Sequence, residues 1–155
     1  MPAVTDYRFL GETGVKVSPL CFGTMSFGGI ADEATSVAMF RRCREVGINF
    51  FDCANVYEDG RSEEILGALI QDCRDEVVIT SKVYFPMGDD PNARGASRYH
   101  IARAVDASLR RLGTDYIDLY FVHRFDEETA LEETLRALDD LVRQGKVLYL
   151  GASNF

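Results

Sequence analysis

The sequence has few of the cysteine and histidine residues that commonly hold zinc. Only four cysteines and two histidines occur among its 155 residues, and no two cysteines form a C-x-x-C pair. This spacing excludes the common zinc sites, and we expect no metal. We expect the cysteines to be small, reduced core residues of a cytoplasmic protein. They are Cys21, Cys43, Cys53 and Cys73.

Basic clusters and long apolar runs are also missing. The formal net charge is -8, and no run of lysine and arginine interrupts the acidic balance. Binding to DNA or RNA needs such clusters, so we expect no nucleic-acid partner. No apolar stretch approaches the roughly 18 residues of a membrane span. The start, "MPAVTDYRFLG", lacks the basic and apolar regions of a secretory signal.

What the sequence does contain is a regular alternation of strand-like and helix-like segments. A hairpin is predicted at about residues 7–18, where glycines flank a short polar pair in "GETG". From about residue 19 onward, short strands alternate with helices. The strands are "LCFGTM", "INFFD", "VVITSK", "YIDLYFVH" and "VLYLGASNF". Strands that are apolar on both faces are typical of a parallel sheet covered by helices.

The helix boundaries follow from capping residues and glycines. The first helix, about residues 33–46, is expected to end at Gly47, and two later helices at Gly113 and Gly145. Ser62 is predicted to cap the amino end of the second helix. His100, at the start of the third, is expected to be an exposed helix residue.

Two architectures fit this alternation: a doubly wound open sheet and a (β/α)8 barrel. The G-x-G-x-x-G motif of an open dinucleotide-binding sheet is absent, and "FGTMSFGG" does not replace it. Polar residues instead end several strands, namely Asp52, Lys82 and His123. Because the carboxyl ends of barrel strands meet at one mouth, these residues are predicted to gather there. A barrel typically needs about 250 residues, so this chain supplies about five βα units.

The residues at this mouth suggest acid–base chemistry. No activated serine or cysteine is evident, so a hydrolase triad is not indicated. The phenol of Tyr57 can donate a proton, and the ammonium of Lys82 would stabilise the phenolate that remains. Asp52 can hold that ammonium, and His123 can orient a carbonyl group. General acid help of this kind is typically worth about 10²- to 10⁴-fold, but the electrons must come from elsewhere.

Five motifs in order resemble the aldo-keto reductase superfamily, and most of all its bacterial stress-protein and potassium-channel β-subunit branch. They are "LGxTGxKVSxLxFGTMxF", "FFDCANVY…GRSEEILG", "ITSKV", "DLYFVHRFD" and "GASNF". The resemblance covers residues 7–155. It implies a TIM barrel closed by an amino-terminal hairpin. It also implies reduction of aldehydes or ketones with a nicotinamide cofactor, with NADPH favoured over NADH.

The resemblance assigns roles position by position. Asp52 matches the active-site aspartate, which also lies beside the cofactor, and Tyr57 matches the general acid. Lys82 matches the lysine that tunes the tyrosine, and His123 matches the histidine that orients the carbonyl. Glu58 departs from the pattern, because many relatives have glycine after the tyrosine. We expect this change to alter loop shape or substrate access.

Further matches concern the cofactor. Gly23, Thr24 and Met25 resemble the segment near the nicotinamide, and Ser153 and Asn154 resemble the pair that bonds its carboxamide. The family's later loops, which grip the rest of the cofactor, have no counterpart in this sequence. Two alternatives to a reductase therefore stay open: a nicotinamide-binding regulatory or sensor subunit with slow turnover, and a truncated, inactive barrel fragment. Neither the carbonyl substrate nor the oligomeric state follows from the residues.

Overall fold

The computed structural model describes residues 6–155. The first five residues, part of the segment considered for a secretory signal, lie outside the described residues. In chain order the elements are β1 (Arg8–Phe9), β2 (Lys16–Val17), β3 (Phe22–Gly23), α1 (Glu33–Glu45), β4 (Phe50–Asp52), η1 (Tyr57–Gly60), α2 (Arg61–Ile70), η2 (Arg74–Glu76), β5 (Val78–Val83), α3 (Arg98–Leu112), β6 (Ile117–Val122), α4 (Leu131–Arg143) and β7 (Val147–Ala152).

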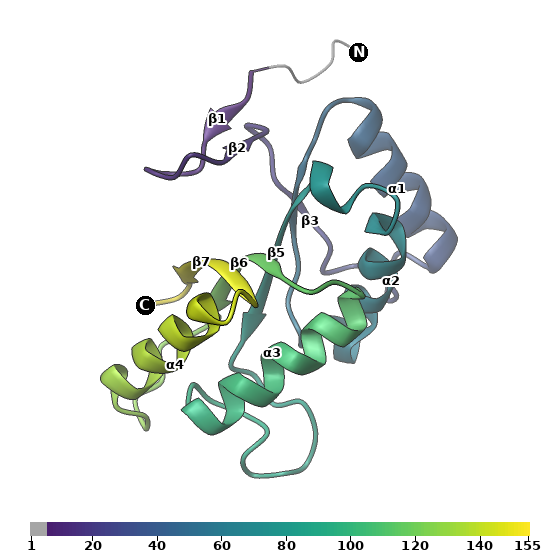
Figure 1. Cartoon of the computed structure of the whole chain (residues 1–155). Helices are drawn as coiled ribbons and strands as arrows, with labels where there is room; N and C mark the ends of the chain where they lie inside the picture. The colour runs from purple at the N-terminus through teal and green to yellow at the C-terminus, as the bar shows by residue number, and fades with distance from the viewer. Residues whose placement is uncertain (1–5) are drawn as a thin grey trace.

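Five parallel strands form one sheet whose spatial order is the order of the sequence, β3-β4-β5-β6-β7. Helices α1 to α4 follow one another along one side of this sheet, each packed on the next (Figure 1). A doubly wound sheet would reverse its strand order and carry helices on both faces. The structure is therefore α/β and corresponds to part of a (β/α)8 barrel, as predicted.

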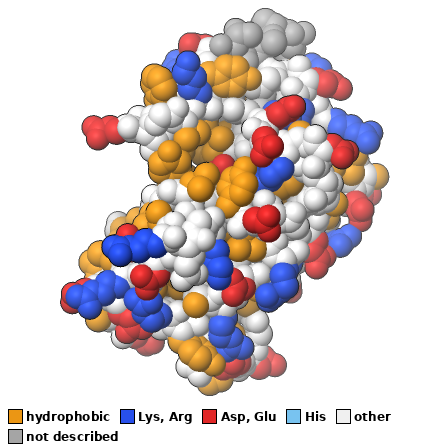
Figure 2. Space-filling model, viewed as in Figure 1, with side chains coloured by type: hydrophobic (Ala, Val, Ile, Leu, Met, Phe, Trp, Pro, Cys, Tyr) orange, Lys and Arg blue, Asp and Glu red, His pale blue; other side chains and the backbone are white. Residues whose placement is uncertain are grey.

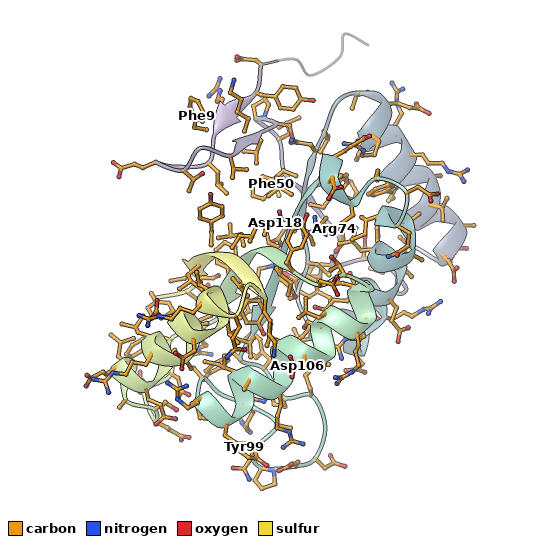
Figure 3. The ribbon with its side chains drawn as sticks, viewed as in Figure 1. Phe9, Phe50, Arg74, Tyr99, Asp106 and Asp118 are labelled. Atoms are coloured by element: carbon orange, nitrogen blue, oxygen red, sulfur yellow. The ribbon has the colours of Figure 1, made fainter. Side chains whose placement is uncertain are left out.

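The core lies between the sheet and the helices. Side chains that alternate along the strands fill it, and Phe51, Ile79 and Tyr120 are fully buried there. At the base of β6, the guanidinium of Arg74 lies beside Asp118, with Nη2 donating to Oδ2 at 2.7 Å (Figure 3). The same carboxylate oxygen accepts the backbone N–H of Ile79 at 2.9 Å. These bonds tie η2 and β5 to β6.

The hairpin of β1 and β2 sits at the amino ends of the strands. The Oδ1 atom of Asn49, just before β4, accepts the backbone N–H of Ser18 at 2.7 Å, and its Nδ2 donates to the carbonyl of Lys16 at 3.1 Å. Hydrophobic side chains gather in the hollow below the hairpin, whereas acidic and basic groups are spread over the helices (Figure 2). A groove of about 410 Å³ lies here, between the hairpin turn and strands β6 and β7.

The last strand has an uncovered outer face. Leu148 and Leu150 of β7 are 44% and 40% exposed, and Leu131 and Leu135 of α4 are also exposed. A groove of about 250 Å³ runs between these two elements. Strands β3 and β7 each have only one neighbour in the described part of the chain, so the barrel stays open. Within residues 6–155, no helix has the length and apolar character needed to cross a bilayer.

Three local expectations were wrong. Cys21 is exposed, because it lies on the inner side of the sheet, which the open barrel leaves uncovered. His100 is only 5% exposed, because the loop before α3 folds back over its first turn. Ser62 does not cap α2: the helix starts one residue earlier, after Gly60, whose φ of +92° is left-handed. Cys43 and Cys53 are buried as expected, whereas Cys73 is only half-buried, and all four thiols are free.

Candidate active site

Lys82 is the centre of a hydrogen-bonded cluster at the carboxyl end of the sheet. Its ammonium donates to Asp52 Oδ2 at 2.6 Å, to the carbonyl of Cys53 at 2.8 Å and to the phenol oxygen of Tyr57 at 3.1 Å. Only 8% of the Lys82 side chain is exposed. An ammonium has three hydrogens, so these bonds use all of them. The structure thus brings together three of the predicted residues from β4, η1 and β5.

Thr80 holds the other oxygen of Asp52. Its hydroxyl donates to Asp52 Oδ1 at 2.6 Å, and Thr80 itself is 1% exposed. Strands β4 and β5 place these two residues opposite each other in register. Sequence reasoning missed Thr80, although a signal was present: it stands two positions before Lys82, so both side chains point to the same side of the strand.

The phenol of Tyr57 is positioned by a tight loop. The backbone N–H of Asn55 donates to the carbonyl of Lys82 at 3.3 Å, which anchors the loop to β5. Glu58 and Asp59 then have left-handed φ angles of +47° and +52°. Glycine takes such angles without a steric cost, so glutamate is a less favourable residue than glycine at position 58 of this loop.

His123 follows β6 and faces the same hollow. Its ring meets the ring of Tyr57 edge-on, with centroids 6.0 Å apart, and that of Phe85 at 4.9 Å. Burial, followed by the nearby ammonium of Lys82, lowers the pKa of His123 from its ordinary 6.5. The imidazole is therefore neutral at pH 7. Among residues 6–155, its Nδ1 atom has no hydrogen-bond partner.

Cys53 does not provide a nucleophile beside this cluster. It is fully buried, and its thiol contacts Ser62 Oγ at 3.3 Å. Desolvation, followed by the charge of Glu63, raises the pKa of the Cys53 thiol to about 11. The thiolate is the reactive form of cysteine, so this residue is inert at neutral pH.

The predicted cofactor residues fall into two groups. At the end of β3, Thr24 is fully buried, and its hydroxyl donates to the carbonyl of Asp52 at 3.1 Å. Its own carbonyl accepts from Ser62 at 2.7 Å. The polar groups of Thr24 are thus engaged inside the protein. Gly23 lies opposite Asp52 in register, and the side chain of Met25 is 64% exposed.

The second group follows β7. The amide of Asn154 donates to the carbonyl of His123 and to Ser153 Oγ, both at 2.9 Å. The Ser153 N–H donates to the carbonyl of Val122 at 3.0 Å, which continues the pairing of β7 with β6. Ser153 and Asn154 therefore lie beside His123. In the described part of the chain no donor reaches Asn154 Oδ1, which leaves this oxygen able to accept.

Comparison with known proteins shows which family the chain belongs to. The sequence pattern of the aldo/keto reductase family matches residues 19–155. The chain is 41% identical, over 97% of its length, to a probable voltage-gated potassium channel subunit beta of Arabidopsis thaliana. It is 43% identical, over 97% of its length, to an uncharacterized oxidoreductase of Bacillus subtilis. It is 44% identical, over 99% of its length, to a norsolorinic acid reductase of Aspergillus flavus.

These alignments cover 47%, 49% and 44% of the three relatives, so the chain spans about half of their length. The matched region includes every residue of the cluster around Lys82. Similarity to oxidoreductases agrees with a site that offers acid–base groups and no nucleophile. By the match of its sequence over residues 19–155 and by its partial barrel, the chain belongs to the aldo/keto reductase family.

Proposed function

We propose that the complete protein reduces aldehydes or ketones to alcohols with NADPH, and that Tyr57 is the general acid. The observation that carries this proposal is the contact of one buried ammonium, Lys82, with both a phenol and a carboxylate. Family membership and the reductase-named relative support the oxidoreductase class. The small carbonyl substrate would enter the hollow faced by Tyr57 and His123.

Each residue has a defined task in this proposal. Tyr57 gives its proton to the carbonyl oxygen as negative charge grows there. Lys82 stabilises the phenolate that remains, and Asp52 keeps the ammonium charged and oriented. The neutral imidazole of His123 can donate a hydrogen bond to the carbonyl oxygen, which orients the substrate without supplying the proton.

The reduced nicotinamide would supply the hydride. Ser153, Asn154, Gly23 and Met25 are the residues of this chain that would hold it. The free acceptor Oδ1 of Asn154 and the exposed side chain of Met25 fit such a role. Thr24 would contribute indirectly, because its polar groups bond to Asp52 and Ser62.

Tyr57→Phe in the complete protein tests the assignment of the acid. Removing the hydroxyl should lower turnover of an aldehyde by about 10²-fold or more, because general acid help is lost. The melting temperature should stay close to that of the unaltered protein. Tyr99→Phe, at a tyrosine that is 59% exposed on α3, serves as the control and should keep full activity. Undiminished turnover in Tyr57→Phe would show that another group supplies the proton.

A second function has an observation in its favour. The Arabidopsis relative is named as a probable potassium channel subunit, so the protein could bind the nicotinamide as a regulatory or sensor subunit. Turnover across a panel of aldehydes, measured beside co-purification of partners, separates the two. Fast turnover with no bound partner excludes the sensor function, and slow turnover with a stable partner supports it.

A third possibility concerns the 155-residue chain by itself. We propose that it holds NADPH weakly, since it spans about half the length of its relatives. Titration followed by nicotinamide fluorescence tests this, and tight stoichiometric binding would refute it. We also propose a cytoplasmic location, which the four free cysteines support, because reduced thiols persist in that compartment.

A further inference from the structure

The side chain of His123 makes no hydrogen bond within residues 6–155, although its backbone is fixed on both sides. The backbone N–H donates to the carbonyl of Val83 at 2.9 Å, and the backbone carbonyl accepts from the amide of Asn154 at 2.9 Å. The Nδ1 atom of the ring, in contrast, is buried without a partner in the described part of the chain. A functional histidine is usually oriented by a hydrogen bond to its second ring nitrogen. Another contact must therefore orient this imidazole.

Two aromatic rings make that contact. The ring of Phe85 meets the imidazole of His123 at 80° with centroids 4.9 Å apart, and the ring of Tyr57 meets it at 82° with centroids 6.0 Å apart. Edge-to-face pairs are favourable at centroid distances of about 4.5–7 Å. Phe85 is the nearer of the two and takes no part in the proposed proton transfer. Without its ring, the imidazole would have room to turn.

Phe85 lies at the base of a loop whose two arms are tied together. The N–H of Gly95 donates to the carbonyl of Tyr84 at 2.7 Å, and the N–H of Met87 donates to the carbonyl of Ala93 at 3.0 Å. These two bonds close the loop into one unit. Phe85 and Gly95 therefore keep a fixed relation to each other.

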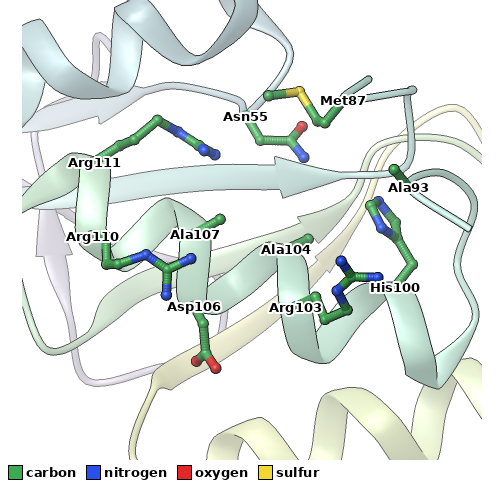
Figure 4. A pocket seen from close by; sticks show the side chains of 10 residues that line it. All are labelled: Asn55, Met87, Ala93, His100, Arg103, Ala104, Asp106, Ala107, Arg110 and Arg111. Carbon is green, nitrogen blue, oxygen red and sulfur yellow. The ribbon is translucent and has the colours of Figure 1, made fainter. Parts of the chain in front are cut away.

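The tip of the same loop lies over the first turn of α3. Met87 and Ala93 line a hollow of about 320 Å³ there, together with Asn55 and His100, which are both buried (Figure 4). The loop thus covers one histidine with its tip and packs on the other with its base. The two histidines therefore report on different parts of one loop.

Asp126 fastens the base of this loop to the segment that follows β6. Its Oδ2 atom accepts the N–H of Ala96 at 2.7 Å and the hydroxyl of Thr129 at 2.8 Å, and its Oδ1 atom accepts the N–H of Glu128 at 3.0 Å. A Cβ atom on Gly95 would lie only 3.0 Å from Oδ2, so the two segments are in close contact. Partial burial raises the pKa of this carboxyl, but the hydrogen bonds lower the pKa by more, so the group is ionised at neutral pH.

The contacts close a circuit that runs from His123 along the chain to Asp126, across to the loop after β5, and back to His123 through Phe85. We propose that Phe85, held in place by Asp126, is the positioning residue for His123. Its ring takes the place of the hydrogen bond that orients other functional histidines. This inference rests on the proposed function, in which His123 donates a hydrogen bond to the carbonyl oxygen. Phe85 and Asp126 act on the reaction only through the imidazole.

Nuclear magnetic resonance titration of the chain tests the positioning without any turnover. In Phe85→Ala, water can reach the imidazole of His123, so its titration midpoint should rise toward 6.5. The charged groups that face the ring, Lys82 and Asp52, stay in place, as does the phenol of Tyr57. A rise of the midpoint therefore reports the lost contact with Phe85.

Asp126→Asn tests the clamp in the same titration. An asparagine has only one accepting oxygen, so it loses the hydrogen bonds on one side of the carboxylate. The midpoint of His123 should rise, by less than in Phe85→Ala. Asp72→Asn, at an exposed aspartate after α2, is the matched control and should leave the midpoint unchanged. The midpoint of His100 should stay constant in Phe85→Ala, because the loop tip remains on α3.

Kinetics of the complete protein test the effect on the reaction. Phe85→Ala should lower kcat for a small aldehyde roughly tenfold and leave KM nearly unchanged, because a misplaced group slows the chemical step. Phe85→Tyr keeps the ring and should restore kcat. Phe9→Ala, at a phenylalanine of the hairpin that is 60% exposed, is the matched control and should keep full activity. In a His123→Ala background, Phe85→Ala should lower kcat no further.

A midpoint of His123 that is unchanged in both Phe85→Ala and Asp126→Asn would overturn the proposal. So would a raised KM with normal kcat in Phe85→Ala, because Phe85 would then only line the path of the substrate. Equal losses of kcat with and without His123 would also refute it. If Phe85→Ala fails to fold, Phe85→Leu replaces it with the same expectations. If the unaltered protein does not reduce aldehydes, the proposed function falls, while the titration still decides whether Phe85 positions His123.

Discussion

At the scale of single residues, the orientation of Asp52 depends on two donors that bind its two oxygens. Lys82 donates a hydrogen bond to Oδ2, and Thr80 donates one to Oδ1. We propose that Thr80 is a positioning residue: it prevents the carboxylate from turning away from the ammonium. Its contribution to the reaction would act through Asp52 and Lys82, since the hydroxyl itself contacts neither Tyr57 nor His123.

Thr80→Val tests this role in the complete protein. Loss of one hydrogen bond to a charged group, about 1.5 kcal/mol, should lower kcat roughly tenfold and leave KM unchanged. The pH profile of kcat should also shift, because the carboxylate next to Lys82 is less well held. Thr80→Ser keeps the hydroxyl and should restore both the value of kcat and its pH profile. A valine variant with normal kcat and an unshifted pH profile would mean that Thr80 only fills space.

The two histidines allow a pH prediction. Burial lowers the pKa of both His100 and His123 from 6.5. Below pH 6.5 the unfolded chain therefore binds protons that the folded chain does not, and stability should fall as the pH drops from 6.5. Nuclear magnetic resonance titration checks this directly, since the chain has only two histidines. Titration midpoints at or above 6.5 would contradict it.

At the scale of elements, a buried ion pair links α2, β5 and α3. Glu63 is fully buried, accepts the hydroxyl of Ser81 and pairs with Arg111 Nε at 2.7 Å. The burial of Glu63 and its ion pair were not predicted, because in the sequence Glu63 and Glu64 look alike as first-turn carboxylates that favour the positive end of the helix. Only packing against β5 separates them: Glu63 points inward, whereas Glu64 faces solvent.

Glu63→Ala should destabilise the chain by roughly 3 kcal/mol. This is the lower end of the cost of breaking a buried pair, since Arg111 retains some contact with water. Urea unfolding gives the measurement. Glu64→Ala, at the neighbouring exposed position, should change the free energy of unfolding by no more than about 0.5 kcal/mol. Equal effects of the two substitutions would argue against a structural role for the buried pair.

The elements themselves were largely predictable, because each strand is a short apolar run and each helix has a clear stop. Lys82 and Asp52 could be placed at strand ends on the same grounds. His100, Ser62 and Cys21 were not placed correctly, since their surroundings come from distant segments. The loop that covers His100 and the carbonyl of Thr24 that binds Ser62 are tertiary partners. Asn55 was missed for the same reason: only the packing of α3 reveals that its amide is buried.

At the scale of the whole molecule, the uncovered side of β7 should govern association. Leu148 and Leu150 expose apolar surface beside α4, and the outer edge of β7 has no neighbouring strand in the described residues. Such surfaces favour contacts between molecules. We expect the chain to associate more strongly as its concentration rises.

Leu150→Lys tests this expectation by sedimentation velocity. A charge on the outer face of β7 should shift the population toward monomer without changing the circular dichroism spectrum. Met39→Lys places the same charge on α1, at a side chain of similar exposure, 38% against 40%, and should leave association unchanged. Identical sedimentation of all three proteins would show that β7 is not the contact surface.

The sequential order of the strands also bears on how the protein is made. A ribosome releases the amino end first, so each strand after β3 emerges when the strand before it in the sheet has already been synthesised. Asp52, Tyr57, Lys82 and His123 all precede α4 in the chain. The four groups can therefore assemble on a nascent chain before the rest of its translation is complete.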